Sequence, residues 1–277
     1  MSYECFTVEI RDKVAHVTLS RPAALNSMNR AFWHELPRIV RESDDSAAAR
    51  AIVLASTGKH FTAGMDLSVF ASGSNLLSDR TGRVRANLMK TVLQLQQTCS
   101  CLDEARIPVL AAVQGGCIGG GVDMVSACDM RYATRDAFFC IQEINIGMTA
   151  DVGTFPRLAY LMPQGIVREL AYTGRRFHAD EARGCGFVNA LFDTHDELLD
   201  AVTGIAVDIA KRSPLAVWGS KEMLNYGRDH TIPDALRHIA VWQTGMFQPA
   251  DMQEAFAAKT DKRDPEFDDL APIEDAI

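Results

Sequence analysis

The first half of the chain repeats one coarse unit, and this repeat limits the folds that the chain can adopt. Apolar strands are expected at residues 51–56 and 108–113, and each leads into a glycine-containing loop and then a helical segment. A hairpin is expected before them, because residues 6–10 and 14–19 alternate around a charged turn. Such units, followed by helices, favour an α/β core with a helical C-terminal part.

Helices and further short strands complete this pattern. Asn29 is a candidate cap for a helix over 30–43, inside which Pro37 predicts a kink or an early break. A long amphipathic helix is expected at 79–103. Short strands are expected at 130–133, 138–142 and 187–192, and helical stretches at 197–212, 214–227 and 231–258. We therefore expect a core over residues 1–195 and a packed helical region over 196–277, with no low-complexity linker between them.

Composition excludes several classes of protein. The net charge of −8 argues against a nucleic-acid partner, and charged residues interrupt every apolar stretch before it could span a membrane. The N-terminus resembles neither a secretory signal nor a mitochondrial presequence, and the last residues are not a peroxisomal SKL-type signal, so we expect a cytoplasmic location. The seven Cys and seven His residues show no metal-ligand spacing, and no GxSxG elbow is present. No metal is therefore expected.

Two glycine-rich segments could bind an anionic group. In the segment 60–66, Gly64 allows successive backbone N–H groups to face a ligand, although a simple tight turn explains it as well. In the segment 115–123, three glycines open a helix whose first N–H groups could face negative charge. The second segment is neither a dinucleotide-binding fingerprint nor a P-loop.

A third segment, 143–154, could carry acid–base chemistry. Glu143 and Asp151 lie eight residues apart among small and apolar neighbours. Apolar surroundings raise the pKa of a carboxyl group, as proton transfer near neutral pH requires. A surface carboxylate at Glu143 and a helix N-cap at Asp151 remain the simpler interpretation.

In this order, the segments resemble the enoyl-CoA hydratase/isomerase (crotonase) superfamily over nearly the whole chain. The resemblance rests on RPAALNSMN (21–29), GKHFTAGMDL (58–67), VLAAVQGGCIGGGVDMVSACDMRYATRDAFF (109–139) and EINIGMTADVGTFPRL (143–158), with SPLAVWGSKEMLN (213–225) in support. It implies an α/β, crotonase-like spiral of repeated ββα units with a helical C-terminal extension. It also implies trimers, often paired into hexamers.

Within the superfamily, the chain resembles the Δ3,5-Δ2,4-dienoyl-CoA isomerases of fatty-acid beta-oxidation. These enzymes carry Asp, Glu and Asp where this chain has Asp123, Glu143 and Asp151, whereas hydratases carry Glu, Glu and a small residue. The chain departs from the isomerases at Asn145, where Asp is usual, and at Pro156, where Gln is usual.

The resemblance implies roles for individual residues, with an acyl-CoA thioester as substrate and no cofactor. CoA would lie across Ala23, Ala24 and Leu25 and contact the turn of Ala63, Gly64 and Asp66. The thioester oxygen would accept hydrogen bonds from the N–H groups of Met65 and Gly120. Asp151 would be the base at C2 and Glu143 the acid at C6, with Asp123 setting the proton affinity of Glu143. Enoyl-CoA hydration or another crotonase-type reaction is the alternative, and a non-catalytic acyl-CoA-binding subunit is a further one.

Overall fold

The fold is centred on a six-stranded sheet, seen in a computed structural model that describes residues 3–66, 69 and 82–273. Its strand order is β1-β2-β3-β4-β6-β9, with β1 antiparallel to β2 and the other pairs parallel. The strands are β1 (Phe6–Arg11), β2 (Val14–Leu19), β3 (Ala51–Ser56), β4 (Val109–Val113), β6 (Met130–Thr134) and β9 (Ala190–Phe192). A second, three-stranded sheet consists of β5 (Gly116–Ile118), β7 (Phe138–Cys140) and β8 (Phe177–His178).

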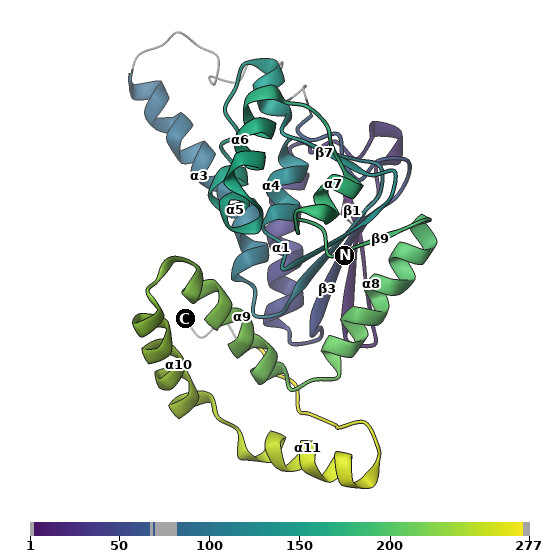
Figure 1. The fold of residues 1–277 in the computed structure, drawn as a ribbon, viewed down its shortest axis with the longest axis vertical. Helices are drawn as coiled ribbons and strands as arrows, with labels where there is room; N and C mark the ends of the chain where they lie inside the picture. The colour runs from purple at the N-terminus through teal and green to yellow at the C-terminus, as the bar shows by residue number, and fades with distance from the viewer. Residues whose placement is uncertain (1–2, 67–68, 70–81, 274–277) are drawn as a thin grey trace.

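Both faces of the large sheet are covered, which explains why β3 and β4 are uninterrupted apolar runs. Ile52 and Leu54 of β3 face a core that contains α1 (Phe32–Asp45), α3 (Gly82–Glu104) and α4 (Gly120–Ser126). The alternate residue Val53 faces α8 (His195–Ala210), which runs along the other side of the sheet (Figure 1). The predicted hairpin and the strands at β3, β4 and β6 are confirmed.

The first long helix differs from its prediction in two ways. Its N-cap is Ala31 rather than Asn29, although the Asn29 side chain still accepts a hydrogen bond from the N–H of Phe32 at 3.2 Å. Pro37 does not break the helix, which continues to Asp45. A proline cannot donate to the carbonyl four residues earlier, and here Thr98 of α3 donates its hydroxyl to that carbonyl of Trp33 at 3.1 Å.

The C-terminal arm consists of α9 (Pro214–Asp229), α10 (Ile232–Met246) and α11 (Pro249–Asp261). Its first helix, α9, packs against the core, where the buried Lys221 donates to the main-chain oxygens of Leu102 and Ile107, and α10 and α11 extend away from the core (Figure 1). The prediction of one helical stretch over 231–258 is therefore wrong. Pro249 disfavours a helical conformation at Gln248, which is extended with φ −110° and ψ 102°. The division at residue 195 stays a prediction, and the packing places α8 with the core and leaves α9–α11 as the extension.

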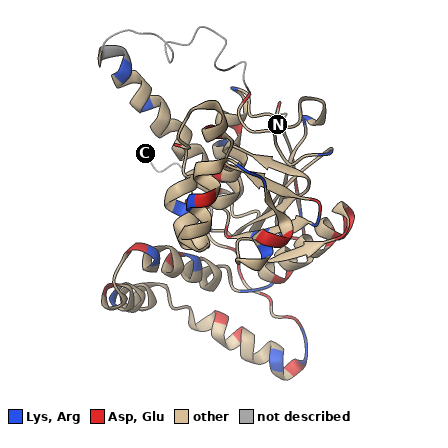
Figure 2. Cartoon of the chain, turned by 45° about the horizontal axis from the view of Figure 1, so that its top comes forward, with Lys and Arg blue, Asp and Glu red and all other residues tan. Residues whose placement is uncertain are grey.

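Three helices between the core strands were not predicted: α5 (Thr154–Leu161), α6 (Gln164–Thr173) and α7 (Ala179–Gly184). Residues 79–81 of the predicted helix 79–103 lie outside the described residues. Within the described part of the chain, no helix is long and apolar enough to cross a membrane. Charges of both signs lie on the core and on the C-terminal arm (Figure 2).

Candidate active site

The three predicted acids come from three separate segments and lie within electrostatic reach of one another. Asp123 is on α4, Glu143 is on the 3-10 helix η3 (Gln142–Ile146), and Asp151 is in the loop before α5. The negative charge of Asp123 raises the pKa of Glu143, and the charge of Asp151 raises the pKa of both. The fold therefore brings together the three carboxyl groups that the sequence singled out.

Asp123 is the most buried of the three, with 1% of its surface exposed. Its Oδ1 accepts hydrogen bonds from both the N–H and the hydroxyl of Thr154, each at 2.7 Å. Burial raises the pKa of Asp123 to about 6, although the two bonds from Thr154 oppose the rise. Asp123 thus accepts the hydrogen bond of the first N–H of α5, although it lies 31 residues earlier in the sequence. The simpler interpretation of Asp151 as the N-cap of that helix is therefore wrong.

Glu143 has the environment of a proton donor. Its Oε2 is buried and has no hydrogen-bond partner among the described residues. Burial, followed by the charge of Asp123, raises the pKa of Glu143 to about 7. Gly119, at φ +53°, leaves room for this carboxyl, because a Cβ there would lie 3.1 Å from Oε1. Glu143 can therefore carry a proton near neutral pH and release it to a nearby atom.

Asp151 has the environment of a base that still contacts solvent. Its surface is exposed, yet the surrounding protein partly desolvates the carboxyl and raises its pKa above the ordinary value. The side-chain amide of Gln96 on α3 donates to the main-chain oxygen of Asp151 at 2.7 Å. This bond connects the loop that carries Asp151 to the long helix α3.

The two amides predicted for the oxyanion hole have no backbone partner among the described residues. Met28 donates to the oxygen of Gly64 at 2.8 Å and accepts from the N–H of Asp66 at 3.1 Å, so the N–H of Met65 between them faces away from Met28. Gly120 is the first residue of α4, where an N–H has no helical acceptor.

Close packing of glycines brings the two turns together. A Cβ on Gly64 would lie 2.6 Å from the oxygen of Ile118 and 3.6 Å from the Cα of Gly119. A Cβ on Gly120 would lie 3.0 Å from the sulfur of Met28. Gly64 has to be glycine because of the 2.6 Å distance to a main-chain oxygen and its φ of +83°, whereas a larger residue at Gly120 would require the Met28 side chain to shift.

The predicted CoA-contacting loop adjoins these turns. Ala23 and Ala24 belong to the 3-10 helix η1 (Pro22–Ala24), and Leu25 follows in the left-handed conformation with 48% of its surface exposed. The oxygen of Leu25 accepts from the N–H of Ala63 at 2.9 Å, and the carboxylate of Asp66 accepts from the hydroxyl of Ser27 at 3.0 Å. The loop and the turn over 63–66 therefore form one surface beside the free amides.

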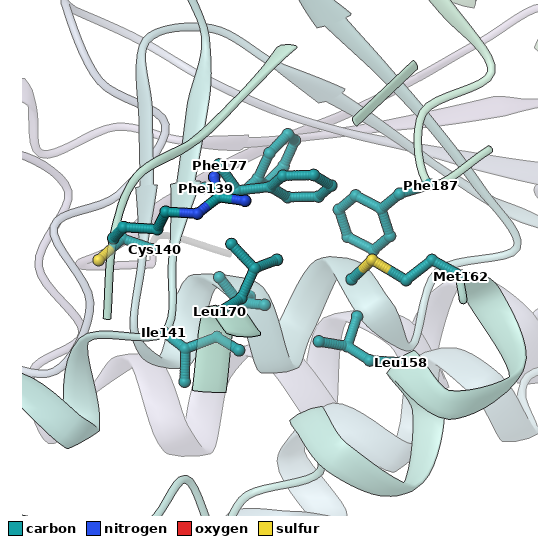
Figure 3. A pocket seen from close by; sticks show the side chains of 10 residues that line it. Phe139, Cys140, Ile141, Leu158, Met162, Leu170, Phe177 and Phe187 are labelled. Atoms are coloured by element: carbon teal, nitrogen blue, oxygen red, sulfur yellow. The ribbon is translucent and has the colours of Figure 1, made fainter. Parts of the chain in front are cut away.

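An apolar cluster packs against α4, which carries Asp123, and against α5. Phe139, Phe177 and Phe187 lie near Leu158 and Met162 of the α5 region around a void of only about 10 Å³ (Figure 3). The rings of Phe139 and Phe187 meet edge to face with centroids 5.1 Å apart. Such packing leaves α5 little freedom to move relative to β7, the strand that leads into η3.

Three residues that hold the site were not predicted from the sequence: Thr154, Gln96 and Met28. Each acts on a partner more than 30 residues away in the chain, so no local pattern identified it. Within the described ranges, no cluster of three or more His, Cys, Asp or Glu side chains could hold a metal ion.

Comparisons with known proteins agree with this geometry. Residues 9–270 match the family model described as enoyl-CoA hydratase/isomerase. The chain is 42% identical over 266 residues to the mouse (Mus musculus) protein named "Delta(3,5)-Delta(2,4)-dienoyl-CoA isomerase, mitochondrial", covering 95% of this chain and 81% of that protein. It is 32% identical to the "Short-chain-enoyl-CoA hydratase" of Clostridium acetobutylicum, covering 92% of this chain and 94% of the relative.

The fold also matches that of a solved structure. The structure described as "Crystal structure of putative enoyl-CoA hydratase from Streptomyces coelicolor A3(2)" superimposes with a TM-score of 0.87 at 28% identity, covering 96% of this chain and 95% of the other. The predicted crotonase-type α/β fold is therefore confirmed.

Proposed function

Since the chain belongs to the enoyl-CoA hydratase/isomerase family, we propose that it isomerises 3,5-dienoyl-CoA to 2,4-dienoyl-CoA in fatty-acid beta-oxidation. The observation that carries the proposal is the set of three coupled carboxyls, two of which have pKa values of about 6 and about 7. The relative at 42% identity carries the isomerase name, whereas the hydratase relative is less similar.

The proposed reaction begins with proton removal at C2. Asp151, as a carboxylate, takes the C2 proton, which the thioester acidifies, and the resulting negative charge spreads over the thioester oxygen and the conjugated chain. The N–H groups of Met65 and Gly120 donate to that oxygen. Loss of one such donor typically costs about 3 kcal/mol of transition-state stabilisation.

The reaction ends with proton delivery at C6. Glu143, protonated because its pKa is raised to about 7, gives its proton to C6, and the double bonds move from positions 3 and 5 to positions 2 and 4. C2 and C6 of an extended chain are too far apart for one carboxyl to serve both, since a proton moves only over hydrogen-bond distance. Two acids with separate environments meet this requirement.

The anchoring of Asp123 argues against the hydratase alternative. Hydration would need Asp123 and Glu143 to hold one water together, and because Oδ1 of Asp123 accepts both bonds from Thr154, only Oδ2 is left for that water. A non-catalytic role is also disfavoured. Placing three acids with raised pKa values close together lowers the stability of the fold, and a protein without catalytic function would gain nothing in return.

The substrate and the assembly belong to the same proposal. An acyl-CoA would lie across Ala23–Leu25, with no cofactor and no metal taking part. The C-terminal arm would form a trimer or a hexamer, because it exposes large apolar side chains: Leu224, Ile232, Leu236, Val241, Phe247 and Phe256. Such a surface is typical of an interface between subunits. A cytoplasmic location remains part of the proposal.

A comparison of two substrates tests the activity. The protein should convert 3,5-octadienoyl-CoA to a product with the ultraviolet band of the conjugated 2,4-dienoyl thioester, much faster than it hydrates crotonyl-CoA. Asp151→Asn should lower the isomerase turnover at least about 100-fold while acyl-CoA binding persists. Brisk hydration of crotonyl-CoA with no action on the dienoyl substrate would overturn the proposal.

A further inference from the structure

We propose that Thr154 is a positioning residue that keeps Asp123 ionised, and that the fixed charge of Asp123 in turn keeps the catalytic proton on Glu143. The inference deepens the proposed function and rests on it for the role of Glu143. Its structural part, the control of Asp123 by Thr154, can be measured without substrate.

The contact between the two residues is direct and dry. Both donors of Thr154, the N–H and the hydroxyl, lie 2.7 Å from the same oxygen of Asp123. Each residue is only 1% exposed, so water does not compete for these bonds. A carboxylate accepts two such bonds better than a neutral carboxyl does, so the pair favours the ionised form.

The charge of Asp123 matters because two acids compete for one proton. Burial acts on both, and their pKa values of about 6 and about 7 lie close together. In such a pair, a change in the hydrogen bonds of one group moves the proton between them. The charges that act on this pair from outside it are those of Asp151 and Arg157, both from the α5 region. The buried thiols of Cys99, Cys117 and Cys140 also face the two acids, but burial raises their pKa values, so they carry no charge near neutral pH.

Arg157 does not replace Thr154 in this task. Its guanidinium contacts other groups: the hydroxyl of Ser100 at 3.0 Å, the carboxylate of Asp103 at 3.5 Å and the oxygen of Gly153 at 3.5 Å. Burial raises the pKa of Asp123 most, the two hydrogen bonds from Thr154 oppose it, and the more distant charge of Arg157 lowers this pKa less than they do. Thr154 is therefore the group that decides which acid holds the proton.

The chain offers a matched set of variants. Thr154→Val removes the hydroxyl and keeps the shape of the side chain. Thr154→Ala also removes the hydroxyl and leaves a smaller side chain, and Thr154→Ser keeps the hydroxyl as a donor. Thr134→Val is the control, because Thr134 is also buried but its hydroxyl has no partner within the described residues.

The first measurement is the titration of the carboxyl groups by ¹³C NMR in the substrate-free protein. In Thr154→Val, the midpoint of Asp123 should move up by about one pH unit, the scale of a hydrogen bond to a charged group, and that of Glu143 should move down. Thr154→Ser and Thr134→Val should titrate like the wild type. The same shift is expected of Thr154→Ala, which covers the case that Thr154→Val does not fold.

The second measurement is the pH dependence of isomerase turnover. Thr154→Val should lower kcat at pH 7 by severalfold to about tenfold, move the optimum to lower pH and leave KM within about twofold. Unchanged carboxyl titrations in Thr154→Val or Thr154→Ala would overturn the inference, as would a Ser variant that behaves like the Val variant. Shifted titrations in a protein that never acts on dienoyl-CoA would refute the proposed function and leave the control of Asp123 by Thr154 standing.

Discussion

Replacing Glu143 by Gln should stabilise the protein at alkaline pH while removing its activity. The buried Oε2 has no partner among the described residues, and the pKa of Glu143 is raised from 4.5 to about 7. A change of that size corresponds to roughly 3 kcal/mol, as an upper limit, by which the ionised side chain destabilises the folded state. The introduced glutamine side chain would have the same shape and would never ionise.

The sign of the pH dependence follows from the direction of that change. The folded protein binds the Glu143 proton more tightly than the unfolded chain, so the cost is absent below pH 4.5 and complete above about pH 7. Glu143→Gln should therefore unfold at higher urea concentration than the wild type at about pH 8.5, with little difference at about pH 4.5. Isomerase turnover should fall at least about 100-fold at every pH.

Glu104→Gln is the matched control, since Glu104 is exposed on α3 and its replacement should change neither stability nor turnover. Equal stability of Glu143→Gln and wild type at alkaline pH would show that Glu143 is not a desolvated carboxylate. Glu143 would then lack the raised proton affinity that its role as the acid requires.

Two further predictions concern the turn over 63–66 and the C-terminal arm. Gly64→Ala should lower turnover about 100-fold and the free energy of unfolding by roughly 1–2 kcal/mol, because its Cβ would lie 2.6 Å from the oxygen of Ile118 at a φ of +83°. Turnover and thermal unfolding are measured beside the control Gly227→Ala on α9, where a Cβ meets open space. Leu236→Glu on α10 should shift the assembly toward monomers in sedimentation, whereas Ile10→Glu on β1 should not, and an unchanged oligomer would exclude the arm as the interface.

The sequence predicted the acids because their chemistry is local. Glu143 and Asp151 lie among small and apolar residues. Gly64 before Met65 and the three glycines at 119–121 mark turns that expose N–H groups. The strands were predictable for the same reason, since β3 and β4 are apolar on both faces. Assigning a reaction to these residues required the family resemblance, because the bare patterns also fit ordinary turns and surface acids.

The sequence did not predict the contacts that connect these segments. Pro37 was expected to disturb its helix. The helix continues because the hydroxyl of Thr98, 65 residues away in the chain, donates to the carbonyl of Trp33 in place of the missing proline N–H. Thr154 resembles any first residue of a helix, and nothing near it in the sequence identifies Asp123 as its acceptor. The helices α5–α7 are short, six to ten residues each, so they depend on packing against the core rather than on a strong periodic pattern.

The different exposure of the acids also constrains how the proposed enzyme returns to its starting state. Each turnover leaves a proton on Asp151 and removes one from Glu143. Asp151 is exposed and can exchange its proton with water, whereas Asp123 is buried and Glu143 keeps one oxygen out of solvent. The raised pKa of Glu143 favours its reprotonation over that of Asp123, whose pKa is the lower of the two. The higher proton affinity of Glu143 relative to Asp123 therefore serves both the forward step and the return, and Thr154 would act on both through Asp123.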